Sequence, residues 1–121
     1  MKYMIAMFGS AEEMGATKTP EWIGEMIQFM IAIDGRLRDS GEMVYNEGLA
    51  DPSQAKVVRL ENGQPVATDG PFAEAKESII GFWVVDVASE ERALELCAEI
   101  VAWSDVVELR PVPSGPPAEY Q

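Results

Sequence analysis

Residues 79–87 read Ile79-Ile80-Gly81-Phe82-Trp83-Val84-Val85-Asp86-Val87, and this stretch decides the fold. Its odd and even positions are both apolar, which is typical of a β-strand that is covered on both faces. Residues 2–8 share this property, because Tyr3, Ile5 and Met7 alternate with residues that are also apolar. The two stretches therefore predict the centre of one β-sheet.

A helix signal follows each of these two strands. Thr19 and Pro20 are the N-cap and first-turn residues of a helix whose apolar positions recur at helical spacing as far as Gly41. Ser89 is the predicted N-cap of a second helix, and its apolar stripe places Cys97 in the core. Residues 9–19 are predicted to form a loop, and residues 42–54 carry no clear period.

A β-hairpin is predicted between the first helix and residues 79–87. Asn62-Gly63 separates two short β-prone runs, at residues 56–60 and 65–68, and this pair is a strong hairpin signal. Residues 106–112 form a last strand. The order β-α-β-β-β-α-β predicts an α+β fold, the ferredoxin-like split βαβ with an extra β-hairpin strand. We expect residues 1–113 to form a single domain and residues 114–121, which are rich in proline, to be a loose tail.

Two helices can cover only one face of this sheet, although its central strands are apolar on both. A second copy of the sheet is the simplest cover for the other face. The sequence thus predicts a homodimer, with two sheets packed face to face in a dimeric α/β barrel. In an alternative, residues 42–54 and 113–121 fold back over that face.

The composition excludes several classes of partner and site. The chain carries 21 Asp and Glu against 9 Lys and Arg, a net charge of −12. Such a surface repels phosphate groups, so neither nucleic-acid nor membrane binding is expected. The N-terminal apolar run is too short for a signal peptide or a membrane span, which favours a cytoplasmic protein. With one cysteine and no histidine, the sequence predicts no disulfide, no metal site and no cofactor.

Residues 66–77 read Val66-Ala67-Thr68-Asp69-Gly70-Pro71-Phe72-Ala73-Glu74-Ala75-Lys76-Glu77, and they closely resemble the DGPF motif of the YCII-related family. Residues 1–4, 48–49, 81–82 and 107–112 resemble the same family, so the likeness covers about residues 1–113. It implies a dimeric α+β barrel with an active-site cleft between helix and sheet. It also implies an association with extracytoplasmic-function sigma factors. The wider family has a His-Asp pair, whereas this chain has no histidine.

The motif supplies most of the candidate site residues. The carboxylate of Asp69, at a strand end, can bind a ligand or relay a proton, or it can simply cap the turn. Lys76 can hold an anionic ligand or lower the pKa of Asp69, and Glu77 is a further candidate. Both can equally be solvated loop charges. Phe72 is either an anchor for the loop or a wall of the cleft.

Tyr3 and Glu47 are weaker candidates for ligand binding on the same argument. The leading hypothesis is a homodimeric domain that binds a small molecule in a cleft near residues 69–77, with a regulatory use. One alternative is a cofactor-free enzyme that uses Asp69 as its acid–base group and Lys76 as an electrostatic partner. The other is a protein-interaction module that docks on an extracytoplasmic-function sigma factor.

Overall fold

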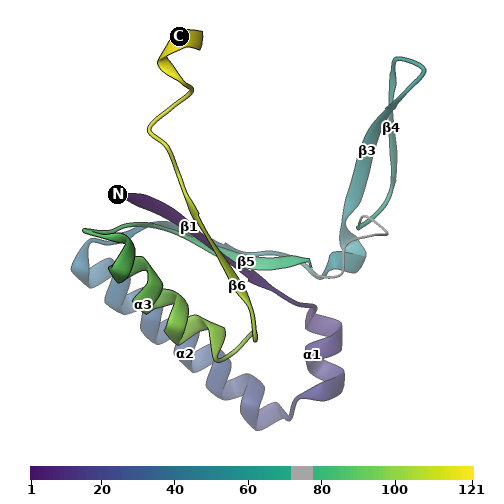
Figure 1. Ribbon diagram of the computed structural model, residues 1–121. Helices are drawn as coiled ribbons and strands as arrows, with labels where there is room; N and C mark the ends of the chain where they lie inside the picture. Colours follow the sequence, from purple (N-terminus) through teal and green to yellow (C-terminus); the bar gives the residue numbers. More distant parts are fainter. Residues whose placement is uncertain (72–77) are drawn as a thin grey trace.

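The computed structural model describes residues 1–71 and 78–121 of the chain (Figure 1). It has three α-helices, two short 3₁₀ turns and two antiparallel sheets within these ranges. In chain order the elements are β1 (Lys2–Phe8), α1 (Ala11–Thr17), α2 (Pro20–Ser40), β2 (Met43–Gly48), η1 (Pro52–Gln54), β3 (Lys56–Glu61), β4 (Gln64–Asp69), β5 (Ile79–Asp86), α3 (Glu90–Val101), β6 (Val107–Pro111) and η2 (Ala118–Tyr120).

The larger sheet has the strand order β2-β5-β1-β6, with every neighbouring pair antiparallel. Strands β1 and β5 are therefore central, as the sequence predicted. This order, with α2 and α3 as the two crossover helices, is compatible with a ferredoxin-like α+β fold. Both helices lie on the same side of the sheet (Figure 1).

The core lies between the larger sheet and these two helices. Alternate residues of the central strands point into it, and Ile5 and Val85 have no exposed surface. The helices contribute the fully buried Ile33 and Ile100 and the buried thiol of Cys97. Desolvation raises the pKa of that thiol, which suits an unreactive core residue.

Polar contacts fix the positions of the helices on the sheet. The indole N–H of Trp83 and the side-chain amide of Asn46 each donate a hydrogen bond of 2.8 Å to the carboxylate of Asp34 on α2. At the other helix, Arg92 of α3 donates hydrogen bonds of 2.9 and 3.0 Å to the two carboxylate oxygens of Glu42, which precedes β2. These bonds lower the pKa of Glu42, against the opposing effect of its partial burial.

The helix caps follow the sequence prediction. The hydroxyl of Thr19 accepts a hydrogen bond of 3.1 Å from the backbone of Trp22, and Ser89 accepts one of 3.2 Å from the backbone of Arg92. Gly41 ends α2 with a φ of 80°, in the left-handed region. Local capping chemistry thus sets the start of both long helices and the end of α2.

Two predictions of local structure were wrong. Residues 9–19 were expected to be a loop, but α1 occupies Ala11–Thr17. Residues 42–54 showed no period, yet β2 forms the second strand of the split βαβ unit. The register of β2 shifts between Met43 and Tyr45. This irregularity places consecutive apolar residues on a strand and removes the alternation that would have identified it.

The predicted hairpin is confirmed, but it does not extend the larger sheet. Strands β3 and β4 pair with each other in a sheet of their own. Their connection has Asn62 at φ 51° and Gly63 at φ 79°, both in the left-handed region that Asn-Gly turns favour. The extra hairpin is therefore an appendage to the ferredoxin-like unit, and not a source of one of its strands.

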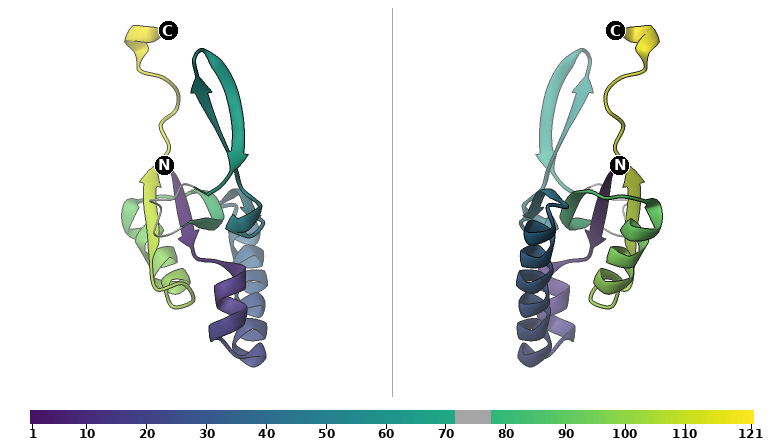
Figure 2. Two further views of the ribbon diagram at one scale, coloured as in Figure 1. Left: turned by 90° about the vertical axis from the view of Figure 1, so that its right-hand side faces the viewer. Right: turned by 90° about the vertical axis from the view of Figure 1, so that its left-hand side faces the viewer.

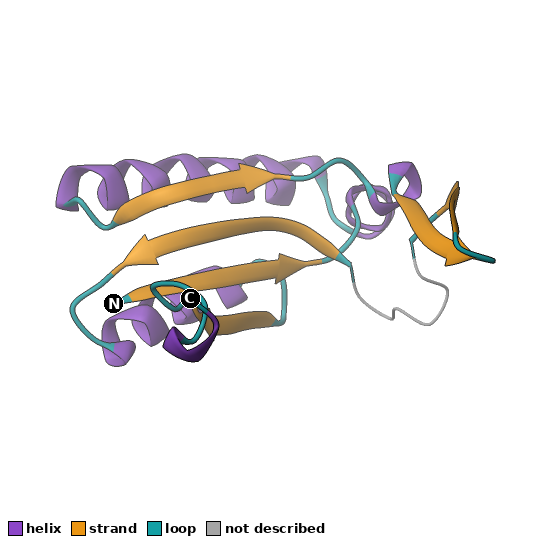
Figure 3. Cartoon of the chain, turned by 90° about the horizontal axis from the view of Figure 1, so that it is seen from above, coloured by secondary structure: helices purple, strands orange, loops and turns teal. Residues whose placement is uncertain are grey.

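The second face of the larger sheet lies opposite the helices. In both side views the helices lie to one side, whereas the hairpin and the C-terminal tail project to the other (Figure 2). Seen from above, the four strands lie in front of the helices (Figure 3). Residues 43–48 form an edge strand and residues 113–121 lead away from the sheet (Figure 1). Neither segment covers this face in the way that the alternative hypothesis required.

Side chains at the centre of this open face are apolar, whereas its β6 edge carries the ion pair between Glu108 and Arg110. Alternation along β1 and β5 places Met4, Phe82 and Val84 there, each partly exposed. Tyr45 of β2 is 54% exposed and lies against Phe82, with 5.9 Å between ring centroids. The charge of the nearby Glu47 raises the pKa of Tyr45. Within residues 1–71 and 78–121, no helix is long and apolar enough to cross a membrane.

Candidate functional site

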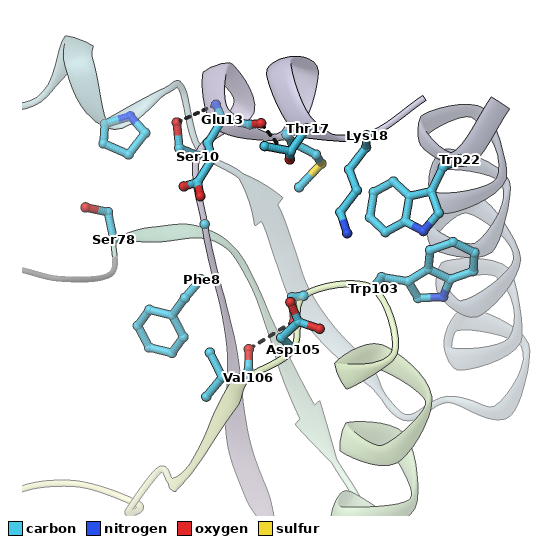
Figure 4. Close-up of a pocket in the computed structure, with 14 residues that line it drawn as sticks. Phe8, Ser10, Glu13, Thr17, Lys18, Trp22, Ser78, Trp103, Asp105 and Val106 are labelled. Carbon is cyan, nitrogen blue, oxygen red and sulfur yellow. Dashed lines mark hydrogen bonds between the residues drawn. The ribbon is translucent and has the colours of Figure 1, made fainter. Parts of the chain in front are cut away.

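A cleft of about 540 Å³ lies at the end of the sheet where β1 passes into α1 (Figure 4). Its walls come from α1 and the start of α2, and from the turn between α3 and β6, which is distant from both in the sequence. The lining residues are Phe8, Gly9, Ser10, Glu13, Met14, Thr17, Lys18, Trp22, Pro52, Ser78, Trp103, Ser104, Asp105 and Val106. A cleft of this size is within the usual range for sites that bind small molecules.

Capping interactions position the α1 wall. Ser10 is the N-cap of α1, and its hydroxyl accepts a hydrogen bond of 3.2 Å from the backbone of Glu13. The same hydroxyl donates a bond of 3.1 Å to the carboxylate of Asp51, which also accepts one from the backbone of Glu12. Hydrogen bonds from Ser53, followed by these two, hold the pKa of Asp51 far below its usual range. An ionised Asp51 therefore ties the start of α1 to η1.

Two tryptophans form the aromatic wall of the cleft. Trp22 of α2 and Trp103, which follows α3, have ring centroids 5.4 Å apart at a tilt of 58°. Phe29, two helical turns further along α2, also lies against Trp103, with 5.7 Å between ring centroids. The ammonium of Lys18 lies 4.8 Å from the centre of the Trp22 ring. The indole face of Trp22 thus already accommodates one cation, by a cation–π contact.

Two carboxylates, those of Glu13 and Asp105, line the same cleft. Within the described part of the chain, the carboxylates of Glu13 and Asp105 receive no hydrogen bond and form no ion pair. Asp105 has a φ of 65°, and its backbone N–H donates a bond of 2.9 Å to the carbonyl of Val101. Aspartate tolerates this left-handed conformation better than most residues. The tight turn therefore fixes the backbone of Asp105 beside the aromatic wall while its side chain stays available to a ligand.

A second, smaller hollow of about 250 Å³ lies at the base of the hairpin. Pro71 and Ser78 are among its lining residues, so it adjoins both ends of the segment 72–77. It shares Pro52 and Ser78 with the larger cleft. Of the two hollows, this one lies closer along the chain to the cleft that the sequence predicted near residues 69–77.

The residues predicted from sequence do not gather in one place. Asp69 is at the end of β4, where its carboxylate is 87% exposed and forms an ion pair with Lys56 across the hairpin. Tyr3 is only 4% exposed and faces the core, and Glu47 is exposed on β2 beside the open face. The other candidates, Phe72, Lys76 and Glu77, lie outside the described residues.

The structure explains why position 70 of the motif is glycine. A β-carbon added there would lie 2.9 Å from the Cγ2 atom of Val57. The backbone N–H of Gly70 donates a hydrogen bond of 2.8 Å to the carbonyl of Ala55. The close approach of the two hairpin ends therefore requires glycine at this position.

Sequence reasoning missed the cleft residues, although one signal was present. Ser10 and Glu13 have the Ser-x-x-Glu spacing of a capping box, which predicts a helix that starts at residue 11. If this helix had been predicted, Glu13 and Lys18 would have been expected at an ordered element and not in a loop. Trp103 and Asp105 carried no comparable signal, because only the fold brings residues 103–106 next to residues 8–22.

No cluster of three acidic or thiol side chains that could hold a metal ion occurs among residues 1–71 and 78–121. Among the described residues, the groups that the cleft offers to a ligand are indole faces, two carboxylates and one ammonium. They can bind and orient an organic molecule.

Comparison with known proteins gives two matches. The family model of the YCII-related domain matches residues 1–114, nearly the whole chain. An uncharacterized protein of Rhizobium meliloti (strain 1021) is 30% identical over 69 residues, which are 57% of this chain. The matched region is 56% of that relative, so the chain aligns with little more than half of its length.

Proposed function

This chain belongs to the YCII-related family, and on that premise we propose that it is a homodimeric domain that binds a small organic molecule. We place the binding site in the cleft between α1, α2 and the α3–β6 turn. The observation that carries this proposal is the cleft itself, about 540 Å³ of space lined by two tryptophans and by two carboxylates that have no partner among the described residues. Apolar walls with a few polar groups are the usual composition of a small-molecule site.

The homodimer follows from the open face of the sheet. Met4, Phe82 and Val84 lie on that face, opposite the layer of helices. Contiguous apolar surface on a sheet costs free energy unless another layer covers it. A second copy related by a two-fold axis would present the same surface to the first. The hairpin and the tail, which project to that side, would then flank the partner (Figure 2).

A binding function fits the chemistry of the chain better than acid–base catalysis. The chain has no histidine, and Asp69 is mostly exposed and paired with Lys56. A catalytic carboxylate usually needs a desolvated setting to titrate near neutral pH. From residues 66–77 we infer that the chain belongs to the DGPF branch of the family. We also infer that the bound molecule has a regulatory role. The link to a sigma factor stays a prediction.

A thermal-shift screen of metabolites tests the binding site. We would screen the wild type, Trp103→Leu and Asp69→Asn in parallel. A ligand at 100 times its dissociation constant stabilises a protein by about 2.7 kcal/mol. For a domain of this size that raises the melting temperature by on the order of ten degrees.

We expect hits whose shift is lost in Trp103→Leu and kept in Asp69→Asn. Hits lost only in Asp69→Asn would move the site to the hairpin end and contradict the cleft. A complete absence of hits would contradict small-molecule binding.

Light scattering after size exclusion tests the homodimer. Val84→Lys places a charge on the open face and should convert the dimer to a monomer. The matched control is Ile31→Lys on α2, where the side chain is already 61% exposed. A wild type that is monomeric at micromolar concentration would contradict the homodimer.

A further inference from the structure

We propose that the cleft selects organic cations, namely an ammonium group carried by an apolar or aromatic body. This inference rests on the proposed function, because it names the class of molecule that the same cleft takes. It depends on four features of the described residues, which are the indole faces, the balance of charge, the apolar walls and the position of Lys18.

The indole faces favour a cation over an anion. The face of an indole ring carries partial negative charge, so it attracts ammonium groups and repels carboxylates and phosphates. Trp22 and Trp103 contribute two such rings to one cleft, 5.4 Å apart and tilted rather than stacked flat. The ammonium of Lys18 already uses this attraction, 4.8 Å from the Trp22 ring centre.

The charges of the cleft favour the same sign of ligand. Among the described residues that line the cleft, Glu13 and Asp105 supply two carboxylates and Lys18 supplies one ammonium. Neither carboxylate has a hydrogen-bond or ion-pair partner among the described residues. A bound cation would give them one. The net charge of −12 adds a long-range potential that concentrates cations near the surface and keeps anions away.

The remaining walls select for an apolar body on the ligand. Phe8, Met14 and Val106 line the cleft together with the two indoles. They would bury a ring or a short alkyl chain, while the ammonium reaches the carboxylates. A small inorganic cation would leave these walls in contact with water, so the apolar surface favours an amine with an organic body.

The effect of removing the ammonium of Lys18 distinguishes a cation site from an anion site. Its backbone N–H donates a bond of 2.9 Å to the carbonyl of Met14, so the backbone has a fixed role at the end of α1. Its ammonium is held by the Trp22 ring, and within the described chain it forms no ion pair. An incoming cation competes with it for that ring. Removal of the ammonium should therefore strengthen the binding of a cation and weaken the binding of an anion.

Three probes of similar shape and different charge test the selectivity. They are phenethylamine, 2-phenylethanol and phenylacetate, titrated into the full-length protein by isothermal calorimetry. We expect phenethylamine to bind about threefold more tightly than the neutral alcohol, as one cation–π contact at a partly exposed ring allows. Phenylacetate should bind most weakly of the three.

Variants of the cleft assign the effect to its residues. Lys18→Met keeps the apolar stem, and we expect it to raise the affinity for phenethylamine. Glu13→Gln and Asp105→Asn should each lower that affinity several-fold, with 2-phenylethanol unaffected. Glu61→Gln, an exposed carboxylate on the hairpin, is the matched control and should change nothing.

The outcomes separate this inference from the proposed function. If phenylacetate binds most tightly, or if Lys18→Met weakens the binding of the amine, the selectivity for cations is wrong although the cleft still binds small molecules. If none of the three probes binds at millimolar concentration, the proposed ligand class fails. The proposed function fails with it only when the metabolite screen also yields no hit that depends on Trp103.

Discussion

The two sheets of this molecule are built from similar residues and are buried very differently. In the larger sheet, Ile5 and Val85 have no exposed surface. In the hairpin, Val58 and Leu60 alternate on one face of β3 and are 64% and 75% exposed. An isolated two-stranded hairpin is marginally stable in water. The difference teaches that strand-forming residues do not decide burial here, because within residues 1–71 and 78–121 helices cover the larger sheet and not the hairpin.

The apolar side of the hairpin and the open face of the larger sheet would both be stabilised by a covering layer. Both lack a covering layer within the described chain, and the hairpin projects from the side of the sheet on which the open face lies (Figure 1). One second copy of the chain could cover both surfaces. The contrast between covered and uncovered β-structure is therefore the strongest structural argument for the proposed homodimer, and it can be tested residue by residue.

The largest expected effect on the free energy of unfolding comes from shortening a buried side chain in the covered layer, which is the larger sheet together with α2 and α3. Leu96 of α3 is 1% exposed and packs in the core against the larger sheet. Leu96→Ala should lower the free energy of unfolding by about 2–5 kcal/mol, because it removes buried methyl groups and leaves a cavity. Denaturation by urea measures the change.

Leu60→Ala is the matched truncation in the hairpin. Under conditions that keep the chain monomeric, it should change the free energy of unfolding by less than about 0.5 kcal/mol, as is usual at an exposed site. Equal losses for Leu60→Ala and Leu96→Ala in the monomer would contradict the contrast between the two sheets. A loss at Leu60 that appears only in the dimer would sharpen it.

The sequence predicted best those parts of both sheets and helices that local signals mark. Thr19, Ser89 and Gly41 act through local hydrogen bonds and backbone conformation, so their roles were visible without the fold. Asn62-Gly63 marked the hairpin for the same reason. Strand β2 was missed because its register shift hides the alternation, and α1 was missed although Ser10 and Glu13 have the capping-box spacing.

The candidate site was predicted less well, for a physical reason. A motif in consecutive residues draws attention to one stretch, here residues 69–77. The cleft is instead assembled from residues 8–22 and 103–106, together with Pro52 and Ser78, which only tertiary packing brings together. Trp103 illustrates this, because nothing in its neighbours along the chain indicates that it faces Trp22.

The next largest effect is expected where α3 meets the edge of the larger sheet. Glu42 accepts two hydrogen bonds from Arg92, and its side chain is 18% exposed. Glu42→Gln should lower the free energy of unfolding by about 1–2 kcal/mol, because a charge-assisted pair becomes a weaker neutral contact. Thermal denaturation at pH 7 measures the loss, and Glu95→Gln, at the more exposed partner of Arg92, is the control.

The same pair predicts a dependence on pH. The hydrogen bonds from Arg92 lower the pKa of Glu42 below its ordinary value of 4.5 in the folded chain. A depressed carboxylate pKa contributes stability above the unfolded pKa, and this stability is lost as the pH falls through the folded pKa. The difference in stability between the wild type and Glu42→Gln should therefore shrink below about pH 4.5. A difference that stays constant from pH 7 to pH 3 would contradict this role of Glu42.

A smaller effect on the free energy of unfolding is expected at the N-cap of α1. Ser10→Ala removes the hydroxyl that accepts from Glu13 and donates to Asp51. It should cost about 1 kcal/mol, the usual loss for an N-cap serine. It should also loosen the α1 wall of the cleft and weaken the binding of any ligand there. Calorimetry on Ser10→Ala and Ser89→Ala separates the two effects, because the cap of α3 lies outside the cleft and should affect stability alone.

The smallest global effect, and the sharpest local one, is expected at the tip of the hairpin. Gly63 has a φ of 79°, and Gly63→Ala introduces a β-carbon at a left-handed position. The strain should weaken the pairing of β3 with β4 by about 1 kcal/mol. Because β3 and β4 form a sheet apart from the larger one in the described part of the chain, unfolding of the larger sheet should be unchanged in the monomer.

Hydrogen exchange distinguishes the two sheets in this variant. We expect faster exchange at amides of residues 56–69 and unchanged exchange at amides of β1 and β5, since the sheets open independently. Faster exchange throughout the chain would mean that the hairpin stabilises the ferredoxin-like unit directly. In the dimer, protection of residues 56–69 should rise with protein concentration, because the proposed partner supplies the cover that the hairpin lacks on its own.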